Sequence, residues 1–288
     1  MLTRVFRPTN RRLRIVVGLF LAGLFCIQCS RTEAFRQSDF AVAIDGNTVG
    51  KTAPDVVKHL EKLARTDHIA LMRFCLEHYE GRYRDYTCTL IKQERIRGKV
   101  GKEQWISVKF LDKPFSVAMA WTKNAPIGDR ILYVEGKYGG NMLVRPKNSL
   151  ARRLLGTVKR SPTGKEARKN SLRTVDRFGF QRSLRNLLAV YVEAKKAGDL
   201  KESFGGYAKV LDRNTIVAER HLTDSPKYPS CKTRVFIDVE HLMPICVEGY
   251  DSDNNLICRY VYKDVKFNVG LKADDFLPKA NGMDPPKK

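Results

Sequence analysis

Three runs of β-branched and aromatic residues lie close together near the C-terminus, between Arg234 and Phe276. Two short turn signals separate the runs, a pattern typical of consecutive antiparallel hairpins. A sheet of this kind has to bury its apolar face against other elements. The rest of the chain must therefore supply strands that extend this sheet and helices that cover it.

Further strands are indicated upstream, where apolar and polar residues alternate with a period of two from Asp85 onward. Glycine-containing turns follow at Arg97–Gly101 and at Gly139-Gly140. The turns are short, so neighbouring strands should be antiparallel. We expect strands over residues 85–96, 103–111, 115–121, 130–135, 141–145, 207–211 and 215–221.

Two parts of the chain have the apolar spacing of amphipathic helices. The residues from Pro54 to Glu80 predict two short helices or one bent helix. A longer helix is expected over residues 181–197, and Gly198 should end it. These segments are the only predicted elements that could cover the sheet.

The order of elements is helix, about five strands, helix and about five strands, which favours an α+β fold over a parallel α/β sheet. We expect a strongly curved antiparallel sheet, an unclosed half-barrel of about ten strands, with the helices covering its concave face. This single domain should span residues 54–278. A linker at residues 35–53 should precede it, and a disordered tail at residues 279–288 should follow it.

The first 34 residues have the features of a secretory signal peptide. Several arginines precede an almost unbroken apolar run from Ile15 to Cys29, and Ala34 follows at a plausible cleavage position. The run is shorter than the ~20 residues that a membrane span needs. We predict export to the periplasm or cell envelope. Two alternatives stay open: an uncleaved segment that holds the protein at the membrane, and lipidation at Cys29.

The chain is strongly basic, with 53 Lys and Arg residues against 31 Asp and Glu residues. Removal of residues 1–34 would take away six arginines and one glutamate and leave an excess of 17 positive charges. Such an excess favours anionic partners such as a membrane surface or an envelope polymer. Nucleic acid is the least expected of them for an exported protein.

A basic stretch interrupts the strand pattern between Leu150 and Arg173. We expect an exposed loop of variable conformation with one short helix near Leu154. Its cations could bind an anionic surface, or they could form a solvated face without a partner. The candidate residues are Arg152, Arg153, Lys159, Arg160, Lys165, Arg168 and Lys169.

Alternating residues of the expected strand at 115–121 form a candidate apolar cavity. Methionine and large aromatic side chains suit an adaptable apolar pocket. The alternative is that this strand face packs solidly against the helices as ordinary core. The candidate residues are Phe115, Val117, Met119 and Trp121.

The chain contains no recognisable signature of a catalytic, cofactor or metal site. Its five histidines have no HExxH spacing, and no Gly-x-Ser-x-Gly elbow or phosphate loop occurs. A catalytic triad from distant residues is the remaining enzymatic alternative. The cysteines after residue 34 match no metal motif, and we expect buried free thiols at Cys75, Cys88, Cys231, Cys246 and Cys258.

Several short motifs together resemble an uncharacterised domain family of exported planctomycete-type bacterial proteins, over roughly residues 67–276. The motifs are Tyr86-Thr87-Cys88-Thr89, Lys92-Gln93-Glu94-Arg95-Ile96, Pro114-Phe115-Ser116-Val117, Tyr133-Val134-Glu135-Gly136-Lys137 and the closing run Tyr262–Leu271. The architecture, including the C-terminal meander, also resembles the LolA/LolB class of lipoprotein carriers. That resemblance implies an unclosed barrel that cradles acyl chains, although the basic stretch departs from the carrier pattern. It assigns no ligand residue, and as a fold-level analogy it does not establish function.

Two functional hypotheses follow. The first is an exported, non-enzymatic binding protein that holds a lipid or lipoprotein acyl chain in the half-barrel. The second is a structural or interaction module of the cell envelope, which binds an anionic polymer or protein through its basic surface. A cavity large enough for an acyl chain favours the first, and a solidly packed sheet face favours the second.

Overall fold

The computed structural model describes residues 40–44, 46 and 54–285. The described residues form one sheet of thirteen strands, and every neighbouring pair is antiparallel. The strand order is β1-β9-β10-β11-β12-β13-β2-β4-β5-β6-β7-β8, and β3 pairs with β2 beside this path. The strands are β1 (Ala41–Ile44), β2 (Asp85–Ile96), β3 (Lys99–Val100), β4 (Gln104–Leu111), β5 (Ser116–Lys123), β6 (Gly128–Val134), β7 (Met142–Pro146), β8 (Val158–Arg160), β9 (Lys201–Val210), β10 (Arg213–His221), β11 (Lys232–Asp238), β12 (Pro244–Tyr250) and β13 (Leu256–Phe267).

The described part of the chain also contains five α-helices, whose ends follow local signals. Asp67 caps the second helix by accepting a hydrogen bond from the Ala70 amide, and Gly198 ends the fifth helix in a left-handed conformation. None of these helices is both long and apolar enough to cross a membrane. The helices are α1 (Pro54–Thr66), α2 (His68–Tyr79), α3 (Ser149–Leu155), α4 (Lys165–Lys169) and α5 (Phe180–Ala197).

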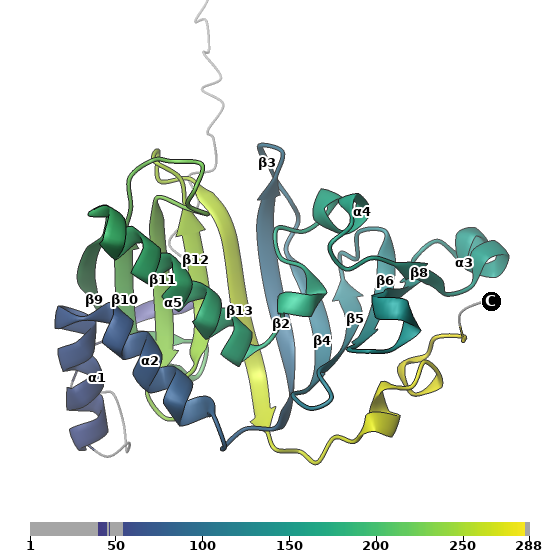
Figure 1. Ribbon diagram of the computed structural model, residues 1–288, viewed down its shortest axis with the longest axis horizontal. Coiled ribbons are helices and arrows are strands. Elements are labelled where there is room, and N and C mark those ends of the chain that lie inside the picture. The colour runs from purple at the N-terminus through teal and green to yellow at the C-terminus, as the bar shows by residue number, and fades with distance from the viewer. Residues whose placement is uncertain (1–39, 45, 47–53, 286–288) are drawn as a thin grey trace, which may run out of the picture. The chain divides into compact units, whose positions relative to one another are not determined.

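The sheet is covered in two halves on the same face (Figure 1). Helices α1, α2 and α5 lie over the strands β9 to β13. The segment that contains α3, β8 and α4 covers the other half, beginning at β2. In this segment α4 lies in front of the strands, β8 pairs at the sheet edge, and α3 lies at that end of the molecule. One large apolar core extends under the helices and includes Leu71, Phe110, Phe180, Leu184 and Tyr191.

A second, smaller core lies on the opposite face of β4 to β7. Two 3₁₀ turns after the last strand, η4 (Ala273–Phe276) and η5 (Lys279–Asn281), supply Phe276 and the nearby Met283 to it. These side chains pack against Ala118, Leu132 and Leu143. The residues from 279 to 285, where we expected a disordered tail, thus include a short helical turn and a buried methionine.

The predicted α+β class and the antiparallel meander β11-β12-β13 are confirmed. The prediction of a strongly curved half-barrel is wrong, because the sheet is open and not strongly curled. The prediction assumed that two helical segments were the only cover for the sheet, so the sheet would have to curl around them to bury its apolar face. Here the basic stretch supplies a second cover, so each half of a wide sheet is buried without curling.

The strand count of about ten is also too low. Three short strands were missed: β1, β3 inside the expected turn at Arg97–Gly101, and β8 inside the expected loop. Each has two to four residues, too few to show a period in the sequence. The predicted signal peptide at residues 1–34 and most of the linker at residues 35–53 lie outside the described residues.

Candidate functional site

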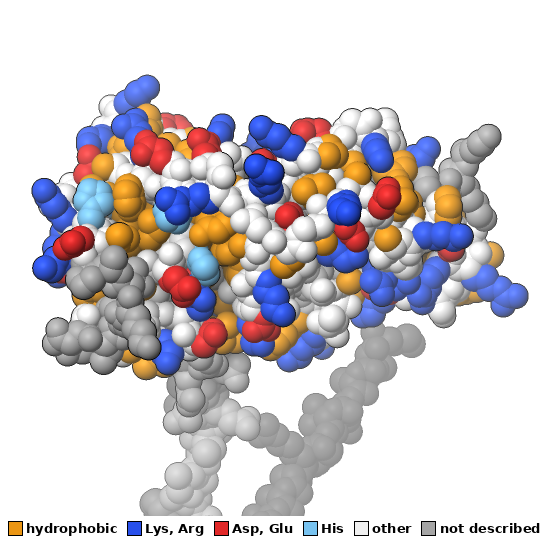
Figure 2. All heavy atoms as spheres, turned by 90° about the horizontal axis from the view of Figure 1, so that it is seen from below, with side chains coloured by type: hydrophobic (Ala, Val, Ile, Leu, Met, Phe, Trp, Pro, Cys, Tyr) orange, Lys and Arg blue, Asp and Glu red, His pale blue; other side chains and the backbone are white. Residues whose placement is uncertain are grey.

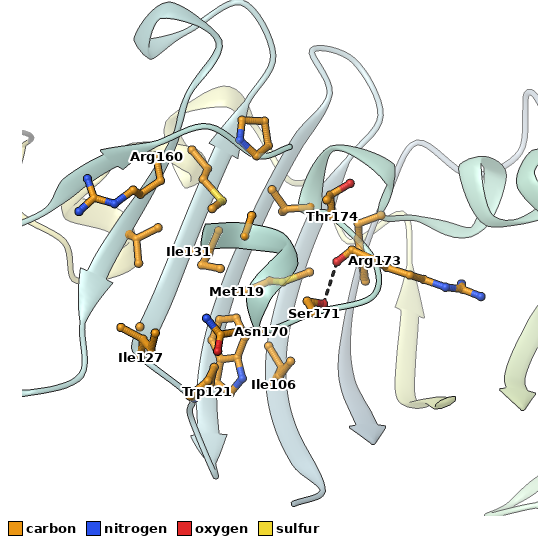
Figure 3. Close-up of a pocket in the computed structure, with 18 of the residues that line it drawn as sticks. Ile106, Met119, Trp121, Ile127, Ile131, Arg160, Asn170, Ser171, Arg173 and Thr174 are labelled. Atoms are coloured by element: carbon orange, nitrogen blue, oxygen red, sulfur yellow. Dashed lines mark hydrogen bonds between the residues drawn. The ribbon is translucent and has the colours of Figure 1, made fainter. Parts of the chain in front are cut away.

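A cavity of about 410 Å³ lies between the sheet and the segment that carries α3, β8 and α4. Its volume is within the ~300–1,000 Å³ typical of small-molecule sites. In Figure 3, Ile131, Met119 and Trp121 project from the strands toward the segment with Asn170 and Ser171. The cavity therefore has a wall made by the sheet and a roof made by the basic stretch.

The sheet wall follows from antiparallel register. Residues directly opposite each other on neighbouring strands point to the same face. Ile106 lies opposite both Leu90 and Trp121, and Met119 lies opposite Ile131. The apolar wall residues are Leu90, Ile106, Met119, Trp121, Ile131, Met142 and Val144.

The roof consists of short elements whose ends are set by local residues. Asn148 caps α3 by accepting a hydrogen bond from the Ala151 amide at 3.0 Å, and Gly156 ends the helix with φ of 61°. Strand β8 then joins the sheet edge through pairs such as Val144 with Val158. The apolar roof residues are Ala151, Leu155, Val158, Pro162, Ala167, Val175 and Phe178.

A buried polar cluster forms one side of the cavity. The Lys92 ammonium donates to a Glu94 oxygen at 3.0 Å and to the Ser171 hydroxyl at 3.0 Å. The Tyr260 hydroxyl donates to the same carboxylate at 2.7 Å. The Leu172 amide also donates to Glu94, at 3.3 Å. Glu94 thus joins β2, β13 and the roof segment through one carboxylate.

Burial raises the pKa of the hydroxyl and thiol groups around this cluster. Desolvation raises the pKa of Tyr260 well above its ordinary value, and the nearby Glu94 carboxylate adds to this effect. Desolvation also raises the pKa of Cys258 to about 11 and that of Tyr262 to about 12. These groups are neutral at ordinary pH, so they are poor nucleophiles or bases and behave as structural groups.

The buried polar groups on the wall are hydrogen-bonded to other protein groups. Glu94 accepts hydrogen bonds from Lys92, Ser171, Leu172 and Tyr260. Trp121 donates its indole N–H to Gln104 at 2.8 Å. Among the described residues, no three His, Cys, Asp or Glu side chains are grouped to hold a metal ion. This arrangement suits apolar binding better than bond-breaking chemistry.

The four predicted cavity residues separate into two pairs. Met119 and Trp121 line the cavity and are partly exposed. Phe115 and Val117 are on the same strand face, but both are buried in the packed core. The Phe115 ring lies against Phe110 and Tyr133 edge-on, and the Arg182 guanidinium lies 3.5 Å from its centre.

The predicted cations are brought together on the elements of the roof, and one of them, Arg160, also lines the cavity. They are exposed or half-buried, and they lie on α3 (Arg152, Arg153), β8 (Lys159, Arg160) and α4 (Lys165, Arg168, Lys169). The Arg160 guanidinium points away from the other labelled side chains in Figure 3, whereas that of Arg173 lies 4.3 Å from the centre of the Tyr260 ring. Seen from below, Lys and Arg side chains gather toward the end of the molecule that carries β6 and β8 (Figure 2).

Sequence reasoning missed the roof and the polar cluster. The roof had a weak signal in its scattered apolar residues, such as Leu155, Val158 and Val175, which the many cations of the stretch obscured. The cluster had a signal in Lys92 and Glu94, which follow Leu90 at a spacing of two and therefore share its inward face. Charged residues at inward positions of a strand mark a buried network.

Fold and cavity together define an α+β domain built on a large open antiparallel sheet, with a mostly apolar cavity on the sheet face. Within this class, a family model matches residues 83–283, and the chain belongs to DUF1571, a family of proteins of unknown function. The expected membership of an uncharacterised family is thereby confirmed. No curated protein matches the chain.

Several solved structures are similar at a low level. MucB in the Pseudomonas aeruginosa MucA/MucB complex has 11% identity and a TM-score of 0.45, over 75% of this chain and 62% of that one. A LolA superfamily protein from Nitrosomonas europaea has 11% identity and a TM-score of 0.30, over 80% and 100%. The Mycobacterium tuberculosis lipoprotein LppX has 12% identity and a TM-score of 0.41, over 72% and 97%. The chain thus spans less than two thirds of the length of MucB, and no function is transferred from similarities this low.

Proposed function

We propose that this protein is an exported binding protein that holds the apolar chain of a lipid or of a lipidated protein in the cavity under the roof. The observation that carries the proposal is a cavity of about 410 Å³ with mostly apolar walls, on a sheet face that is otherwise solidly packed. Each methylene moved from water into such a cavity contributes about 0.8 kcal/mol. A chain of several methylenes would therefore be retained without any polar contact.

The adaptable side chains at the wall support this reading. Met119 and Trp121 are partly exposed, although neighbours on the same face are fully buried. Methionine adjusts its shape to irregular apolar ligands, and tryptophan offers a large flat surface. The roof is joined to the wall at two places, by the pairing of β8 with β7 and by the hydrogen bonds around Glu94. A local movement of the roof between these two attachments would admit a chain.

The experiment that tests the proposal is native mass spectrometry of gently purified protein, followed by lipid extraction. We expect a bound mass that resolves to a lipid or acyl chain. Met119→Glu would place a charge in the cavity and should abolish retention. Ala120→Glu is the matched control, because Ala120 lies on the opposite face of the same strand and is partly exposed.

A protein without bound mass, under conditions that preserve lipid in a known carrier, would contradict the proposal. So would equal retention by wild type and Met119→Glu. The second candidate, an envelope module that binds an anionic polymer or protein, would then be favoured. The exposed cations of the roof support that candidate, and its binding should weaken with salt.

A further inference from the structure

Exposed leucines gather on the short helix α3. Leu150 and Leu154 are each 65% exposed and Leu155 is 54% exposed. A single exposed leucine is ordinary, but residues four apart on a helix lie on one side of it. Helix α3 follows β7 at the end of the molecule where β8 forms the sheet edge (Figure 1). This apolar group is therefore presented outward from the fold.

The same region is uniformly basic. Residues 136–165 contain eight Lys and Arg residues and no Asp or Glu. Arg152 and Arg153 are within α3 itself, and Lys159 and Arg160 follow in β8. The carboxylate of Asp129 accepts two hydrogen bonds of 2.8 Å from Arg145. The positive charge of Arg152 also favours the ionised form of this carboxylate. Among the described residues, no carboxylate lies within ion-pair distance of Arg152, Arg153, Lys159 or Arg160.

Helix α3 also belongs to the cavity. Ala151 and Leu155 line it, and so does Ile127, which is 61% exposed. Ile127 and Leu155 both line the cavity and are exposed, so part of the cavity rim lies beside α3. The leucines, the cations and this part of the rim therefore lie together at one end of the sheet.

We propose that α3 is a membrane-docking element that places this part of the cavity rim on an anionic lipid bilayer. Leu150 and Leu154 enter the boundary between headgroups and acyl chains, and Arg152 and Arg153 contact lipid phosphates. An anionic polymer would engage the cations but would give the leucines no apolar environment. The pairing of the two residue types on one short helix therefore favours a bilayer over a polymer.

The docking surface goes beyond the proposed cavity function, and it can be tested separately from that function. The assay is flotation of the whole chain with vesicles of phosphatidylcholine alone and of phosphatidylcholine mixed with phosphatidylglycerol. Residues 1–39 are the same in every variant, so their contribution cancels in each comparison. We expect binding to the mixed vesicles that weakens as salt increases.

Leu150→Ser combined with Leu154→Ser should weaken binding to mixed vesicles at least about tenfold, because two side chains lose their apolar environment. Both side chains are exposed, so the folded state should not change. The matched control is Val42→Ser combined with Val269→Ser. These residues are 66% and 44% exposed and are not part of α3.

Arg152→Gln combined with Arg153→Gln should weaken binding about thirtyfold at low salt, given the contribution of each cation at an anionic surface. Lys195→Gln combined with Lys196→Gln is the control, because it also removes two adjacent exposed cations from a helix. This control should stay within about threefold of wild type, since only a general charge effect would remain.

Unchanged binding by either α3 variant, or equal binding to both kinds of vesicle, would overturn the proposal. A wild-type protein that self-associates in solution, and a leucine variant that does not but binds vesicles as before, would also overturn it and assign the patch to self-association. Salt-sensitive binding to a soluble polyanion that depends on the arginines but not on the leucines would favour the polymer. Met119→Glu should keep vesicle binding, so failure of the cavity function is distinguishable from failure of docking.

Discussion

At the scale of single residues, Glu94 connects the greatest number of separate parts of the site. Its carboxylate is 4% exposed and accepts hydrogen bonds from β2, from β13 and from the roof. A buried charge is tolerated only when its partners are in place. The pair with Lys92 therefore does more to fix the roof against the sheet than to add net stability.

Glu94→Leu should lower the free energy of unfolding by about 3–5 kcal/mol, because it leaves the Lys92 ammonium buried without its counter-ion. Urea denaturation would measure this cost. Lys92→Met combined with Glu94→Leu should cost less than Glu94→Leu alone, since no uncompensated charge remains. Additive costs in this double-mutant cycle would show that the two side chains do not interact.

At the scale of elements, the segment between β7 and α5 changes the character of the sheet. It contains α3, β8 and α4, and it covers strands that would otherwise expose an apolar face. The segment leads into α5 through Gly179, which has a φ of 107°. A Cβ atom at this position would lie 2.7 Å from the Phe110 ring. The start of α5 is thus fixed by a close approach that only glycine allows.

Gly179→Ala should lower the free energy of unfolding by about 3 kcal/mol, because it combines backbone strain with a clash in the core. Gly198→Ala is the matched control at the other end of α5. Gly198 also has a positive φ, of 73°, but a Cβ atom there would meet nothing within 4 Å. Its cost should be about 1 kcal/mol. Equal costs in chemical denaturation would refute the role of the Phe110 contact.

At the scale of the whole described domain, the sheet carries apolar cores on both faces. The larger core lies under the helices, and the smaller one lies under the C-terminal turns η4 and η5. The two cores share β4 to β6, so the cavity wall is supported from behind. In the proposed entry of a chain, we expect a wall supported in this way to stay in place and the roof to move.

Phe276→Ala should destabilise the domain by about 3–5 kcal/mol, because Phe276 is 2% exposed within the second core. Leu277→Ala is the neighbouring control. Leu277 is 43% exposed, and its loss should cost about 0.5 kcal/mol or less. Thermal unfolding would distinguish the two variants by their melting temperatures. A Phe276→Ala protein as stable as wild type would mean that the C-terminal turns do not contribute to the sheet.

The sequence by itself determined the α+β class, the long strands and the amphipathic helices, because alternation and helical spacing are local patterns. It also placed Met119 and Trp121 on an apolar face. It could not separate them from Phe115 and Val117, because all four residues share one period-two pattern. Which of the four are packed depends on what the helices and the roof place above each position.

Only the tertiary structure decided that the sheet is open and that the basic stretch is a roof. Cations dominate the composition of that stretch, which indicates that part of its surface is exposed to solvent. Composition does not show that the apolar residues between the cations cover the sheet. The strands β1, β3 and β8 exist because a longer strand offers them hydrogen-bond partners, and such pairing joins residues far apart in the chain. The cavity likewise arises from the distance between two packed elements, which no local pattern of residues encodes.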